Sequence, residues 1–78
     1  MEDVQLSDEF PLIVANPERL GAKPCIKDTR ISVMHILELL ASGGTVERIL
    51  EGWPALTQDA IEQAARYAAR QLEAPAVA

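Results

Sequence analysis

The pattern of hydrophobic and polar positions changes its period near residue 33. Before that point, apolar residues come in short runs of strand length, at residues 10–14 and 24–27, with turn residues between them. After it, apolar residues recur three and four positions apart, which is typical of helices that bury one face. The sequence therefore predicts a small N-terminal β-element followed by a helical region.

The β-element is predicted to contain two or three short strands. Pro11 lies in the first apolar run and has no backbone N–H to donate. We therefore expect either that this strand lies at an edge of the sheet or that Pro11 stands at the beginning of the strand. Residues 16–21 are expected to form a single helical turn that leads the chain back. Open strand edges expose backbone groups that a second copy of the chain would cover. The expected strands are residues 11–14, 24–27 and, as a third, 30–31.

Three helices are predicted after the β-element. The first, residues 33–41, is apolar around most of its circumference, so we expect it to be the central helix. A short helix at residues 46–52 and a third helix at roughly 58–73 complete a mainly α fold, a three-helix bundle with a small N-terminal β-element. Each helix follows a hydroxyl side chain that can accept a hydrogen bond from the first helical turn. These capping residues are Ser32, Thr45 and Thr57.

Composition predicts where the domain begins and ends. Residues 1–9 are polar and acidic and are expected to be a mobile arm, and residues 75–78 a tail. Residues 10–74 are expected to form a single domain. A domain of this length removes only roughly 60% of the surface of its unfolded chain from water, so its core is small. We therefore expect a homodimer, held through the β-element and an apolar helix surface.

The composition offers little for catalysis or metal binding. The chain has one histidine, His35, and one cysteine, Cys25, whereas catalytic and zinc sites need several converging side chains. We expect Cys25 to be buried, His35 to be solvated or at a helix interface, and the protein to have no enzymatic activity, metal or cofactor. The longest apolar run is too short to span a bilayer, and the acidic start is unlike a signal peptide. We expect a soluble cytoplasmic protein.

The net charge of −5 conceals an uneven distribution of charges. Residues 1–18 carry five acids and no base, and residues 31–78 sum to −3, whereas residues 19–30 sum to +3. This basic island could bind a phosphate or carboxylate, or Asp28 could pair with its neighbours, and an acidic total is unfavourable for nonspecific nucleic-acid binding. The candidate DNA- or anion-binding residues are Arg19, Lys23, Lys27 and Arg30 of the island and Arg66 and Arg70 of the third helix.

The second and third predicted helices, joined by residues 53–56, resemble a helix-turn-helix, in which the later helix reads DNA bases. Asp59 and Glu62 lie in the first turns of that helix, and their negative charge would oppose contact with phosphates. Along the same helix, Glu62 and Arg66 have the favourable order for an ion pair four residues apart. We therefore treat DNA reading as the alternative, and Trp53, Asp59 and Glu62 as candidates for binding a protein partner.

One stretch of the chain resembles a known family. It runs from Lys23-Pro24-Cys25-Ile26 to Thr29-Arg30-Ile31 and is followed by Ile36-Leu37 and by Pro54, Leu56 and Thr57. These residues resemble the bacterial domain-of-unknown-function family 433 over about residues 10–72. Ala22 stands where that family often has glycine, and Asp28 replaces its usual turn glycine. Because aspartate tolerates a left-handed backbone better than most residues, we expect the turn to be retained.

The resemblance implies a homeodomain-like three-helix fold with a small N-terminal β-element. It also implies genetic pairing with small toxins that resemble PIN-domain ribonucleases, which makes the chain similar to a type II antitoxin. Such antitoxins neutralise their toxin by direct binding, and many also bind their own operator DNA as dimers. The first functional hypothesis is therefore an antitoxin that binds a PIN-like ribonuclease toxin. The alternative is a DNA-binding transcriptional regulator or autoregulator with a helix-turn-helix.

Overall fold

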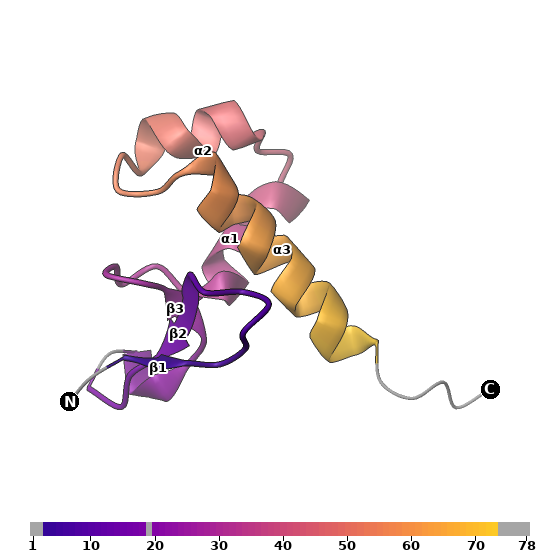
Figure 1. The fold of residues 1–78 in the computed structure, drawn as a ribbon. Coiled ribbons are helices and arrows are strands. Elements are labelled where there is room, and N and C mark those ends of the chain that lie inside the picture. The colour runs from indigo at the N-terminus through magenta and orange to yellow at the C-terminus, as the bar shows by residue number, and fades with distance from the viewer. Residues whose placement is uncertain (1–2, 19, 74–78) are drawn as a thin grey trace.

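The computed structural model describes residues 3–18 and 20–73, which form three short strands and three α-helices (Figure 1). The predicted combination of three helices with a small β-element near the N-terminus is confirmed. None of the helices in the described part of the chain combines the length and hydrophobicity that crossing a bilayer requires. In chain order the elements are β1 (Val4–Gln5), β2 (Ile13–Ala15), the short turn η1 (Leu20–Ala22), β3 (Cys25–Ile26), α1 (Val33–Ala41), α2 (Val46–Gly52) and α3 (Gln58–Leu72).

The strands form one antiparallel sheet in the order β1-β2-β3, so β2 is the central strand. Of the two predicted alternatives, an edge strand or a proline at the beginning of the strand, the structure has the second. Pro11 precedes β2, and its missing N–H therefore does not interrupt the backbone pairing on either side. The edge is occupied instead by β1, whose two residues belong to the segment expected to be a mobile arm. The open side of β2 provides backbone partners that order these preceding residues.

The part of residues 16–21 that the structure describes does not form the predicted right-handed helical turn. The side-chain oxygen of Asn16 accepts a hydrogen bond from the backbone N–H of Glu18 at 2.9 Å, a local bond that favours a turn over a helix. The chain turns later, in η1, where Leu20, Gly21 and Ala22 have φ values of 54°, 63° and 67°. Arg19 lies outside the described residues.

Residues 27–30 form the tight turn between β3 and α1. Thr29 donates to the carbonyl of Ile26 through both its N–H (3.1 Å) and its hydroxyl (2.8 Å). Asp28 has a φ of 63°, so the prediction that aspartate retains this turn is confirmed. Beyond the turn, the carbonyl of Ile31 accepts a hydrogen bond from the N–H of Ile26 at 2.9 Å. Residues 30–31 therefore pair with β3 only at Ile31 and are not a strand of the sheet. The third strand of the sheet is β1.

All three predicted helix caps are confirmed. In each case the hydroxyl oxygen accepts a hydrogen bond from the backbone N–H three residues later, which satisfies one amide of the first turn. The pairs are Ser32 with His35 at 2.9 Å, Thr45 with Arg48 at 3.2 Å and Thr57 with Ala60 at 3.1 Å.

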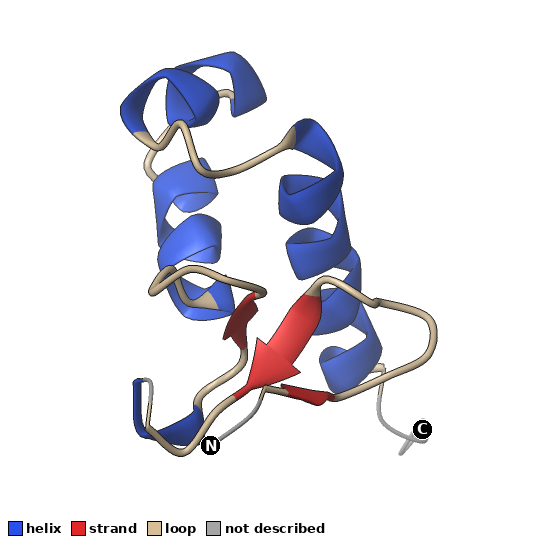
Figure 2. Ribbon diagram, turned by 60° about the vertical axis from the view of Figure 1, so that its left-hand side comes forward, coloured by secondary structure: helices blue, strands red, loops and turns tan. Residues whose placement is uncertain are grey.

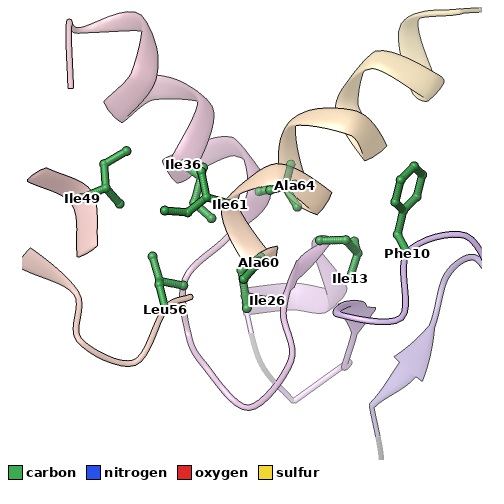
Figure 3. Close-up of a cluster of buried hydrophobic side chains, with 10 residues drawn as sticks. Phe10, Ile13, Ile26, Ile36, Ile49, Leu56, Ala60, Ile61 and Ala64 are labelled. Carbon is green, nitrogen blue, oxygen red and sulfur yellow. The ribbon is translucent and has the colours of Figure 1, made fainter. Parts of the chain in front are cut away.

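The core is built around α3, which contacts α1, α2, β2 and β3. Its buried face carries Ala60, Ile61 and Ala64, and the two small alanines let neighbouring elements approach closely. Figure 3 shows this face among side chains from the sheet and the other helices. The buried cluster consists of Phe10, Ile13, Ile26, Val33, Ile36, Ile49, Leu56, Ala60, Ile61 and Ala64.

The prediction that residues 33–41 form the central helix is wrong. Only Val33 and Ile36 of α1 are buried, and Met34 is 61% exposed. In Figure 2, α1 and α3 run side by side, α2 lies across one end of the pair and the sheet lies at the other. α1 therefore covers one side of α3, and its apolar residues outside that contact remain partly exposed.

Candidate functional site

A groove lies between the exposed face of α3 and the segment that leads into β2. It has a volume of about 500 Å³. Four residues singled out from the sequence come together here: Asp59, Glu62, Arg66 and Arg70. We call this surface the α3 groove; it is lined by Glu9, Phe10, Asp59, Glu62, Gln63, Arg66, Ala69, Arg70 and Glu73.

The helical period places most of the charged residues in one row. Asp59, Glu62, Arg66 and Arg70 are spaced three or four residues apart, so their side chains lie on the same face of α3. Glu73 follows at the C-cap of the helix. The opposite face of the helix carries the buried alanines and Ile61. The amphipathic pattern that packs α3 into the core therefore also forms one wall of the groove.

The other wall is the segment around residues 9–12, which is bound to α3 at several points. The backbone N–H of Leu12 donates to Oε1 of Gln63 at 2.9 Å. Phe10 is buried, and its ring lies edge-on to Tyr67 with centroids 6.1 Å apart and planes at 86°. These contacts hold the segment beside the helix and fix the width of the groove.

Arg70 is held by two carboxylates. Its Nε and Nη2 donate to Oε1 and Oε2 of Glu9 at 3.1 and 2.7 Å, and Nη1 lies 3.4 Å from Oε1 of Glu73. The hydrogen bonds to Glu9, then the charges of Glu9 and Glu73, raise the pKa of Arg70 above its ordinary value. A candidate for anion binding, Arg70 is thus already paired within the chain.

Among the described residues, the side-chain donors that bind Asp59 and Glu62 are neutral amides. Nε2 of Gln63 donates to Asp59 at 3.1 Å, and Nε2 of Gln58 donates to Glu62 at 3.2 Å. The predicted ion pair between Glu62 and Arg66 does not form among the described residues, because Glu62 turns toward the preceding helical turn instead. Neutral amide donors do not cancel the negative charge, and neither carboxylate makes an ion pair with a residue that the structure describes. Asp59 and Glu62 therefore make this end of the α3 groove acidic.

The basic residues of the island that the structure describes flank β3: Lys23 precedes the strand, and Lys27 and Arg30 lie in the turn between β3 and α1. Lys23, Lys27 and Arg30 are exposed, and none of them makes an ion pair with any residue that the structure describes. Pairing of Asp28 with its neighbours is likewise not seen in that part of the chain. We call residues 27–30 the basic turn. Leu12 lies between the two surfaces, because its N–H donates to Gln63 and its carbonyl accepts from Lys27 N–H at 2.8 Å.

Trp53 does not line the α3 groove. It is partly buried at the end of α2, where His35 of α1 lies edge-on to it with ring centroids 5.3 Å apart. Beside it is a second hollow of about 360 Å³. This hollow is lined by Leu39, Ser42, Gly43, Gly44, Arg48, Ile49 and Trp53.

The two reactive residue types lie apart from these surfaces. Cys25 is fully buried in β3, as predicted, and His35 is exposed at the contact between α1 and the end of α2. Among residues 3–18 and 20–73, no three His, Cys, Asp or Glu side chains are grouped closely enough to hold a metal ion.

Comparison with known proteins shows the family of the chain. Residues 13–68 match the model of the family described as "Protein of unknown function (DUF433)". The chain belongs to this family. It is also similar to the uncharacterized protein y4eO of Sinorhizobium fredii, with 37% identity over 57 residues. That match covers 73% of this chain and 26% of the relative, so the chain spans only about a quarter of the length of that relative. No solved structure matches the chain.

The part that matches the DUF433 model contains only some of the groove. Asp59, Glu62 and Arg66 lie inside the match, and so does the basic turn. Glu9 and Arg70 lie outside it. Sequence reasoning missed Glu9 as a groove residue, because it is 61 positions from its partner Arg70 and no periodic pattern links the two.

Proposed function

We propose that this DUF433 protein acts as an antitoxin that neutralises a PIN-like ribonuclease toxin by direct binding. The observation that supports the proposal most is the uncompensated negative charge of Asp59 and Glu62 in the α3 groove. A surface that binds RNA needs positive charge to meet the phosphates, and an acidic groove is complementary to such a surface. A protein bound there would keep RNA away from the toxin.

The net charge of −5 supports the same kind of partner. A protein with an excess of negative charge attracts a positively charged partner and increases the rate of productive encounters. The proposal gives the chain no catalytic activity of its own, and it places the protein in the bacterial cytoplasm, where its toxin would act. Cys25 and His35 lie in different parts of the fold, which is consistent with a role in binding.

Co-expression with the product of the neighbouring small open reading frame tests this proposal. We expect the neighbour to arrest growth alone, and the chain to restore growth and to bind it in a pull-down. In the variant Asp59→Asn/Glu62→Gln, binding should weaken about tenfold or more, because the groove loses two carboxylates. A harmless neighbour that does not bind would contradict the proposal.

A matched control separates the groove from total charge. Glu47→Gln/Glu51→Gln also removes two carboxylates, but from exposed positions on α2 outside the α3 groove. This control should bind the toxin as the native chain does. Equal losses in both variants would show that net charge, and not the groove, determines binding.

A second candidate function is transcriptional regulation or autoregulation through operator DNA. The observation that favours it is the basic turn, where Lys27 and Arg30 are exposed and make no ion pair with the described residues. In this proposal the three helices are homeodomain-like and α2 and α3 act as a helix-turn-helix. Because Asp59 begins the exposed row of α3, the basic turn would supply the phosphate contacts.

Mobility shift with the upstream promoter at two salt concentrations tests DNA binding. Each lost phosphate contact reduces the slope of log K against log salt by about 0.9, so Lys27→Ala/Arg30→Ala should reduce it by about 1.8. Asp59→Asn/Glu62→Gln serves as the control and should bind at least as well as the native chain. Failure of the native chain to bind at low salt would rule out this function.

A further inference from the structure

The edge of β2 is covered by a strand that has few contacts of its own. β1 consists of Val4 and Gln5, and both are exposed, Val4 to 57%. Neither side chain belongs to the buried cluster, so β1 is held by backbone pairing with β2 and by contacts at its ends. Such a strand can leave the sheet without removing a core side chain, which makes its local opening inexpensive.

The contacts at the ends of β1 define what fits this edge. At one end, the backbone N–H of Leu6 donates to the carbonyl oxygen of Ile13 at 3.3 Å. On the other side, Nδ2 of Asn16 donates to a carboxylate oxygen of Asp3 at 2.9 Å, and Asn16 is only 6% exposed. A strand that takes the place of β1 must therefore pair with the backbone of β2 and also offer an acceptor to this buried amide.

A hinge separates β1 from the core. Phe10 is 4% exposed and packs on Tyr67, so the chain is fixed from that residue onward. The preceding Ser7–Glu9 lies outside the buried cluster and is folded into a turn, in which Phe10 N–H donates to the Ser7 carbonyl at 3.2 Å. Opening the turn breaks this bond and extends three residues over about 10 Å. The pair between Glu9 and Arg70 is half-exposed at both side chains, so it adds little to closure.

We propose that the edge of β2 binds residues Asp3–Leu6 of a second copy of this chain, so that two protomers exchange their β1 strands across a two-fold axis. The exchanged strand makes the same contacts as the native one, and only the hinge changes, which is why exchange of identical elements costs little. A second copy fits better than an arbitrary strand because it brings the same carboxylate to Asn16. The proposal is independent of the toxin and concerns a surface distinct from the acidic end of the groove.

A disulfide between β1 and β2 shows whether the two strands pair within one chain or between two chains. Val4 and Ala15 lie directly opposite each other, so Val4→Cys/Ala15→Cys places two thiols within bonding range. The variant is refolded at about 10 μM and about 1 mM, oxidised and run on a non-reducing gel. If the strands are exchanged, the fraction of chains in a covalent dimer should rise about fivefold or more from the lower to the higher concentration, as mass action requires. An internal disulfide in monomers at both concentrations would overturn the proposal.

Two controls accompany the cross-link. The single variants Val4→Cys and Ala15→Cys measure dimers that form by chance collision, and they should stay below the double variant. Cys25 is fully buried and is left in place, because a side chain without exposure does not compete for oxidation. Equal covalent dimer in a single variant and in the double variant would also count against exchange.

Sedimentation provides a test that needs no new cysteine. Inserting Gly-Ser-Gly-Ser between Asp8 and Glu9 lengthens the hinge and lets β1 fold back easily, so the dimer population should fall about fivefold or more. Removing residues 1–6 takes away the exchanged strand and should leave a monomer. A truncated chain that still dimerises, whether through another surface or by direct pairing of two β2 edges, would overturn the proposal, as would a native chain that is monomeric at about 1 mM.

Discussion

At the scale of single residues, two glycines determine how α1 ends. Gly43 has a φ of 92°, and its N–H donates to Leu40 at 3.1 Å, while the N–H of Gly44 donates to Leu39 at 3.0 Å. These two bonds form a Schellman motif, which satisfies carbonyls that the helix leaves open. Only Gly43 needs the left-handed backbone. Gly44 is required for a different reason, because a Cβ built there would lie 2.8 Å from the carbonyl oxygen of Leu39.

This close approach predicts the effect of Gly44→Ala. The obstructing atom belongs to the backbone and cannot rotate away, so we expect a loss of about 1–3 kcal/mol in the free energy of unfolding. Gly52→Ala is the matched control, since Gly52 ends α2 and a Cβ there meets nothing within 4 Å. That variant should be neutral or gain about 0.5–1 kcal/mol from helix propensity. Urea unfolding measures the free energy of unfolding of both variants. Equal values would show that the end of α1 shifts to accept the added Cβ at no cost.

At the scale of elements, the helices could be predicted from the sequence because their signals are local. Ser32, Thr45 and Thr57 each cap the expected helix, and the row from Asp59 to Arg70 follows from the helical period alone. The sequence could therefore predict one wall of the α3 groove.

The strands and the packing order depend on contacts between distant residues. Polar and apolar residues alternate over residues 3–7, but this run is short and acidic residues surround it. Val4–Gln5 forms a strand because β2 offers it an edge. The importance of α3 was missed because its buried residues include Ala60 and Ala64, which are weakly hydrophobic yet permit the closest contacts. Conversely, the leucines of α1 suggested full burial, whereas Leu37, Leu39 and Leu40 pack against the core and are only partly buried.

At the scale of the whole molecule, charge of opposite sign is separated on two surfaces. The acidic end of the α3 groove and the basic turn lie on either side of Leu12, whose backbone groups connect to both. A basic protein at the groove and an acidic polymer at the turn would therefore not compete for the same side chains. Charge-neutralising variants of one surface should leave the other partner bound, which is why Asp59→Asn/Glu62→Gln serves as the control in the test of DNA binding.

Salt should weaken a complex at the α3 groove mainly by slowing the association of the two proteins. Asp59 and Glu62 are exposed, so their attraction for a basic partner acts through solvent and is screened over about 10 Å at 0.1 M ionic strength. Raising the ionic strength from about 0.05 to 0.5 M should slow association with the toxin by about tenfold and change dissociation much less.

Glu47→Gln/Glu51→Gln should retain this response, and Asp59→Asn/Glu62→Gln should lose most of it. Stopped-flow or surface-binding kinetics measures both rates. If salt acted mainly on dissociation, the carboxylates would be buried against the partner in tight ion pairs, and the groove would act through direct contact instead of long-range attraction.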